Sequence, residues 1–226
     1  GQCDSLESIT IPDHITGIGD FAFHDCDSLK SIEFADSVTS LGSSVFRGCN
    51  KLENFDLPEK LTSIGGYAFY NCDSITEVKI PDSVTTINYA AFNSCDSLTK
   101  VTIGNSVKSI GSSAFYGCTR LKSISFPYSL TYIGKYAFCE CTSLTSVTIP
   151  DSVTIIEARA FAKTALTEAN ITSAVKVGDF AFGESKVTKV TFGANLEELG
   201  ENPFYGCAIA TFATEQEIVF NEQVIG

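Results

Sequence analysis

Cysteine is the residue type whose chemistry and spacing stand out most in this 226-residue chain. The chain has nine cysteines, and seven of them recur at intervals of 23 residues: Cys3, Cys26, Cys49, Cys72, Cys95, Cys118 and Cys141. Thiols can pair as disulfides, bind metals or act as nucleophiles. Equivalent residues of stacked strands lie about 4.8 Å apart with parallel Cβ directions, whereas a disulfide needs converging Cβ atoms about 3.8 Å apart. We therefore predict reduced, buried thiols that serve as small hydrophobic residues.

Other residues that could support catalysis or metal binding are sparse. The two histidines, His14 and His24, stand at different positions of neighbouring repeats, so a shared metal site is not expected. No serine, histidine and aspartate fall at one level of the repeat, and no glycine-rich phosphate loop follows a predicted strand. The sequence therefore predicts no catalytic residue, no metal site and no cofactor, in a protein that is not an enzyme.

Phenylalanine keeps the same interval as cysteine. It recurs at Phe23, Phe46, Phe69, Phe92, Phe115, Phe138 and Phe161. Such spacing is typical of a solenoid, in which every repeat places the same side chain at the same point of one continuous core. We predict about nine stacked repeats, the first of them truncated.

One repeat shows how the chain is expected to turn. The segment 123–126 alternates polar and apolar residues, which predicts a half-buried strand, and Pro127 ends it because proline has no N–H to donate. Gly134 recurs in most repeats and suggests a residue with positive φ, and the pair Ala137–Phe138 suggests a short helical turn. We expect a curved, right-handed repeat stack with a parallel β-sheet on its concave face and short helical turns on its convex face.

The interval shortens towards the C-terminus. At the same repeat position, Phe161 is followed by Phe182 and Phe204, which give repeats of 21 and 22 residues. We assign residues 1–207 to the repeats and residues 208–226 to a C-terminal cap that contains an alternating strand. The chain opens inside a repeat, so we expect a fragment of a longer protein whose upstream repeats cover the strand at residues 8–11.

Composition excludes several kinds of partner. The formal net charge is −12, whereas binding to nucleic acid or to an anionic membrane needs clustered lysine and arginine. No apolar run approaches the roughly 18 residues of a membrane-spanning helix, so we expect no membrane insertion. A hydrophobic content of 44% is enough for a full core.

The repeat itself resembles that of a known family. Its pattern is C-x-x-L-x-x-V/I-x-I-P-D-S-V-T-x-I-G-x-x-A-F, whose first half is seen most fully in residues 141–154. This resembles the BspA-like leucine-rich repeat over residues 3–207. The resemblance implies a surface-exposed or secreted protein, extracellular or at the cell surface, in some members adhesive toward host matrix proteins or other cells. It implies no catalytic motif.

The outward positions of the predicted strands form a candidate binding face. We expect its polar side chains to contact a protein or glycan partner on a host or neighbouring cell, and opposite charges to pair at Glu77–Lys100 and at Asp56–Lys79. The candidate residues are Glu33, Asn54, Asp56, Glu77, Lys79, Lys100, Ser123, Ser125, Ser146, Thr148, Glu168, Asn170 and Lys189.

The residues after the core phenylalanine form a second candidate surface. Tyr70, Tyr116 and Tyr205 follow it directly and are expected either to face outward for recognition or to lie on neighbouring repeats. Cys139 occupies the same repeat position, which predicts an outward-facing, accessible thiol.

Three functions remain open from the sequence. The first is a non-enzymatic binding module, the second a structural spacer with no ligand, and the third a fragment whose catalytic site lies in a neighbouring domain. Clustered exposed aromatic side chains would favour binding, whereas an evenly polar surface would favour the spacer.

Overall fold

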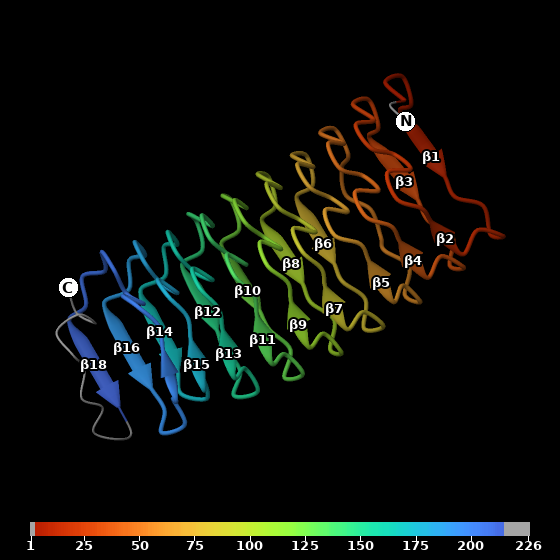
Figure 1. The fold of residues 1–226 in the computed structure, drawn as a ribbon. Helices are drawn as coiled ribbons and strands as arrows, with labels where there is room; N and C mark the ends of the chain where they lie inside the picture. The colour runs from red at the N-terminus through yellow and green to blue at the C-terminus, as the bar shows by residue number, and fades with distance from the viewer. Residues whose placement is uncertain (1–2, 215–226) are drawn as a thin grey trace.

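The computed structural model describes residues 3–214, and over this range the chain is a parallel β-solenoid (Figure 1). Each repeat adds a rung, and β1 and β18 lie at opposite ends of an elongated stack (Figure 1). Nine two-residue strands stack in one of its sheets, which agrees with the predicted number of repeats. The predicted handedness and curvature stay predictions.

The strands predicted from the polar–apolar alternation form the first sheet. Their pairing keeps equivalent repeat positions in register, as in Ser123↔Ser146 and Ile124↔Val147, because the repeat length is constant. The sheet is divided into three parts, β1–β3, β6–β12 and β14–β18. Its strands are β1 (Ser8–Thr10), β3 (Ser31–Glu33), β6 (Glu77–Lys79), β8 (Lys100–Thr102), β10 (Ser123–Ser125), β12 (Ser146–Thr148), β14 (Glu168–Ile171), β16 (Lys189–Phe192) and β18 (Thr211–Thr214).

A second parallel sheet runs through the stack without interruption and was not predicted. Each repeat contributes one strand of two residues, of which the second is generally buried. The strands are β2 (Gly17–Ile18), β4 (Ser40–Leu41), β5 (Ser63–Ile64), β7 (Thr86–Ile87), β9 (Ser109–Ile110), β11 (Tyr132–Ile133), β13 (Ile155–Ile156), β15 (Lys176–Val177) and β17 (Glu198–Leu199). Two residues are too few to show an alternating pattern in the sequence.

The predicted helical turns are wrong: residues 3–214 contain no helix. Two residues in each of these turns have positive φ, for example Tyr136 at 59° and Glu140 at 62°, which no right-handed helix tolerates. Their hydrogen bonds alternate: the backbone N–H of Cys139 donates within the turn to the carbonyl of Tyr136 at 3.1 Å, and that of Phe138 donates to the carbonyl of Ala160 in the next repeat at 2.8 Å. Stacking on the next repeat therefore satisfies every second N–H group, which a helix would satisfy internally.

The recurring glycine also has a different cause from the predicted one. Gly134 does not have positive φ, but a Cβ placed on it would lie 2.7 Å from the carbonyl carbon of Gly111 in the preceding repeat. Glycine is therefore favoured because the backbones of adjacent repeats approach each other closely at this point, and Asn88 and Glu157 take its place in two repeats.

Phenylalanine and cysteine build the core as two parallel ladders. The Phe92 ring stacks on Phe69 and Phe115 at centroid distances of 5.2 and 5.5 Å, with interplanar angles of 6° and 5°. Each buried ladder thiol from Cys49 to Cys141 donates to the carbonyl of a phenylalanine in the preceding repeat, at 3.0–3.2 Å. The cysteines of residues 3–214 are unpaired, and those of the 23-residue ladder are buried apart from Cys3, which is exposed.

The prediction for Cys139 is wrong. Its side chain is buried, with only 4% of its surface exposed. Burial raises the pKa of this thiol to about 11, with a further contribution from Glu140 and opposing ones from Lys163 and Arg159. A turn with two positive-φ residues does not have the side-chain directions of a helix, so the inward and outward positions assumed for a helical turn do not apply.

The proposed C-terminal cap lies mostly outside the described residues. β18 pairs in parallel with β16 and so extends the first sheet by a further strand. The predicted strand at residues 214–220 has only its first residue within the described range, and the cap stays a prediction.

Candidate functional site

The thirteen predicted face residues lie on the outward side of the first sheet or on the segment 54–56 beside it, and each is exposed. The register sets charged side chains next to each other, as at Glu77↔Lys100 and Glu168↔Lys189. Alternation within each strand directs these side chains to solvent while their apolar neighbours enter the core. We call this surface the strand face.

The strand face opens where residues 52–58 form no strand between β3 and β6. The side-chain carbonyl of Asn54 accepts hydrogen bonds from the backbone N–H groups of Thr76 and Glu77, both at 3.0 Å. At the next junction the backbone carbonyl of Thr76 accepts the two equivalent bonds, from Thr99 and Lys100. The Asn54 amide thus replaces a backbone carbonyl, and regular pairing between the two repeats is lost.

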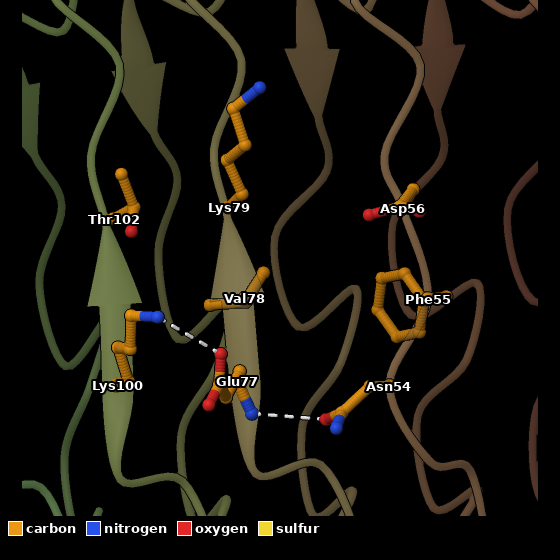
Figure 2. A pocket seen from close by; sticks show the side chains of 8 residues that line it. All are labelled: Asn54, Phe55, Asp56, Glu77, Val78, Lys79, Lys100 and Thr102. Atoms are coloured by element: carbon orange, nitrogen blue, oxygen red, sulfur yellow. Dashed lines mark hydrogen bonds and ion pairs between the residues drawn. The ribbon is translucent and has the colours of Figure 1, made fainter.

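The interruption leaves a groove of about 370 Å³. Figure 2 shows side chains of three neighbouring repeats around it, with the Asn54 amide joined to the backbone of Glu77. A second groove of about 410 Å³ continues across β8 and β10, whose pairing is reduced to Ser125↔Thr102. The first groove is lined by Asn54, Phe55, Asp56, Glu77, Val78, Lys79, Lys100 and Thr102.

The charges of the groove pair only partly as predicted. The Lys100 ammonium lies 3.2 Å from the Glu77 carboxylate, which confirms that pair. Lys79 forms its ion pair with Glu59 at 2.6 Å, whereas Asp56 attracts Lys79 without forming an ion pair with it. The hydrogen bond and charge of Glu59 raise the pKa of Lys79, with a smaller contribution from Asp56. Both ion pairs are exposed and contribute little to stability, so their charges are available to a partner.

The groove includes residues that the sequence did not identify. Phe55 and Val78 supply apolar surface and Thr102 supplies a hydroxyl, so the groove combines apolar contact with charges of both signs. The signal in the sequence is Asn54, which stands where most other repeats carry serine, lysine or a carboxylate and can provide an amide carbonyl.

The histidine, cysteine and carboxylate side chains of residues 3–214 lie apart from one another as potential metal ligands, and no three of them come together. His24 lies 3.1 Å from Asp25 and packs edge-on against Phe21, in a turn remote in sequence from the groove residues. No helix of the described chain is long and apolar enough to cross a membrane.

Comparison with known proteins identifies relatives. The profile described as the BspA type leucine rich repeat region matches residues 1–122 and 108–223, with six copies. A leucine-rich repeat protein from Bacteroides ovatus is 30% identical, with a TM-score of 0.83, and the match covers 94% of this chain and 61% of that one. A leucine-rich repeat protein from T. pallidum is 30% identical with a TM-score of 0.64, covering 70% of this chain and 76% of that one.

A third solved structure carries a descriptive name. It is a leucine rich cell surface protein from Faecalibacterium prausnitzii, 26% identical with a TM-score of 0.60, and the match covers 92% of this chain and 60% of that one. No relative was found among curated proteins. The chain thus spans about three fifths of the length of the first and third of these structures.

Proposed function

Because the chain belongs to the BspA-type leucine-rich repeat family, we propose that it is a non-enzymatic binding module of a cell-surface or secreted protein. Two observations support the location and the role. The similar protein from Faecalibacterium prausnitzii is described as a cell surface protein. A repeat stack offers an extended surface that suits macromolecular partners rather than small substrates.

The groove beside Asn54 carries this proposal. An extended segment of a partner protein fits it, because the groove is open to solvent, has an apolar floor at Phe55 and Val78, and offers Asp56 and Lys79 as opposite charges. Backbone amides and charged side chains of such a segment would find complementary groups. The adhesive role of some family members is consistent with a protein ligand.

A spacer is the second candidate function, and one observation favours it. Several charges of the strand face already pair with each other, for example Glu168 with Lys189 at 3.5 Å. A surface whose charges satisfy one another holds its shape without a ligand. The spacer would separate an attached domain from the cell surface and bind nothing itself.

Biolayer interferometry on immobilised collagen, laminin and fibronectin, together with binding to cultured epithelial cells, separates the two candidates. The binding module predicts saturable binding that weakens about tenfold in Lys79→Ala, as for a residue central to an interface. The control Lys108→Ala removes another exposed lysine, which directly precedes β9 of the second sheet. No saturable binding to any of these surfaces would favour the spacer. Identical weakening by both variants would contradict the groove as the binding site.

A further inference from the structure

A cluster of tyrosines lies on the turns that follow the second sheet. The Tyr67 ring meets Tyr70 and Tyr89 edge-to-face, at centroid distances of 5.7 and 4.9 Å. The Arg47 guanidinium lies 5.8 Å from the centroid of Tyr67 and 5.1 Å from that of Tyr70. Tyr89 is 49% exposed, and Tyr67 and Tyr70 are half-buried. We call Arg47, Tyr67, Tyr70 and Tyr89 the tyrosine cluster.

Contacts between repeats hold these rings in place before any ligand arrives. Tyr67 and Tyr70 each have at least two aromatic or cationic neighbours, and Tyr89 meets Tyr67 edge-to-face, so little side-chain freedom remains to be lost on binding. The same turns continue with Tyr116 and with Tyr136, whose ring lies 5.2 Å from the Lys135 ammonium. Burial and a hydrogen bond to Glu140 raise the pKa of Tyr116 to about 12, so this phenol stays protonated.

The charge of these turns differs from that of the whole chain. The net charge is −12, yet the turn segments 65–71, 88–94 and 111–117 contain no aspartate, glutamate, lysine, arginine or histidine. Their polar groups are amides and hydroxyls. The side-chain amide of Asn71 donates to the side-chain carbonyl of Asn50 at 3.2 Å, and the Ser94 hydroxyl donates to the side-chain carbonyl of Asn93 at 2.8 Å.

We propose that this edge of the stack, from the tyrosine cluster to Tyr136, binds a linear polysaccharide of neutral sugars. A sugar ring has a face of C–H groups that packs on the negative face of an aromatic ring. Its hydroxyl rim matches amides and hydroxyls, which donate and accept. Binding of an uncharged ligand does not bury an unpaired charge of the ligand. The three segments carry no charged side chain that such a ligand would leave unpaired.

The spacing of the repeats favours a chain over a single sugar. Successive rungs lie about 4.8 Å apart, a step similar to the length of one sugar unit in an extended polysaccharide. The two grooves of the strand face are lined by other residues, so this edge is a separate surface along which several sugar rings can lie.

Other partners fit this edge less well. Nucleic acid would need several clustered cations against its phosphates, whereas this edge offers Arg47 at one end and Lys135 at the other, with none in the three segments between them. A second copy of the chain would need a broad apolar patch, whereas the exposed part of each tyrosine ends in a hydroxyl. A protein partner remains an outcome of the test.

Affinity electrophoresis of the folded chain tests the proposal, with gels that contain hydroxyethyl cellulose, mixed-linkage β-glucan or galactomannan. Wild-type protein should be retarded in at least one gel, and Tyr67→Ala/Tyr89→Ala should raise the apparent Kd at least about tenfold. Tyr89→Phe should retain binding because it keeps the ring. The control Tyr128→Ala removes a tyrosine that is 91% exposed elsewhere and should change nothing.

Further controls separate this proposal from the strand-face function. Lys79→Ala should leave retardation unchanged, and Tyr67→Ala/Tyr89→Ala should leave any protein binding unchanged. Thermal melting shows that each variant is folded, and the single variant Tyr89→Ala replaces the double variant if that one unfolds. No retardation in any of the three gels, equal loss in Tyr128→Ala, or a concentration-dependent dimer that Tyr89→Ala abolishes would each overturn the proposal.

Discussion

Replacement of a central core phenylalanine should destabilise the chain far more than replacement of the first one. Phe92 has no exposed surface and stacks on a ring at each side. Phe23 is only partly buried and stacks on Phe46 alone, at 5.3 Å. A buried phenylalanine-to-alanine change costs about 3–5 kcal/mol, and each aromatic pair contributes about 0.5–1.5 kcal/mol of stability.

These values give about 5 kcal/mol for Phe92→Ala, because both the cavity and two stacked pairs are involved, and about 2 kcal/mol for Phe23→Ala. Urea denaturation followed by circular dichroism measures both free energies of unfolding. The slope of unfolding free energy against urea shows whether the repeats still unfold together, since a weakened centre of a repeat array can decouple its two halves. Equal losses of unfolding free energy in the two variants would refute a continuous core in which each stacked ring pair contributes stability.

Three further predictions concern the thiols and the sheet opening. Brief alkylation of native protein followed by mass spectrometry should modify Cys3 first and leave Cys95 and Cys139 unreacted until denaturant is added; early labelling of Cys139 would contradict its burial. Asn54→Ala should lower the free energy of unfolding by about 1–2 kcal/mol. It should also speed hydrogen exchange at the backbone N–H groups of Thr76 and Glu77, because both lose their acceptor. Unchanged exchange there would mean that the Asn54 side chain does not hold the two repeats together. Burial raises the pKa of a thiol, so the folded chain keeps this group protonated to a higher pH than the unfolded chain does. The contribution to folding stability is therefore complete below the unfolded-state pKa, near 9, and is lost as the pH rises toward the folded-state pKa. Cys139→Ala should therefore reduce the loss of stability between pH 9 and 11 by about 1.4 kcal/mol per pH unit in parallel chemical denaturations, and an unchanged slope would contradict the raised pKa.

The sequence predicted the parts of the fold that the repeat length controls. A constant interval of 23 residues places Ser123 opposite Ser146 and Glu77 opposite Lys100, so the first sheet and its register could be derived before the structure. The buried thiols followed from the same interval. These features depend on which residues are equivalent, and equivalence is visible in the sequence.

The turns and the groove could not be derived in this way. An alanine–phenylalanine pair is compatible with a helical turn, and the positive φ of Tyr136 and Glu140 is stabilised by bonds to the next repeat that local sequence does not show. Lys79 contacts Glu59, which lies three residues beyond Asp56 in the preceding repeat, outside the strand register used for the prediction. The groove results from one side-chain amide that substitutes for a backbone carbonyl, which is a tertiary event.

The two sheets also differ in a way that concerns bending of the whole stack. The second sheet is continuous through nine strands, whereas the first is divided at residues 52–58 and again between β12 and β14. Hydrogen bonds between parallel strands run from rung to rung, along the direction in which the repeats succeed one another. A force that bends the stack would therefore separate the strands of the first sheet at its two gaps, while the uninterrupted second sheet bends and stays paired. We expect the groove beside Asn54 to widen or narrow with such bending, so that mechanical load on the chain would change its capacity to hold a partner.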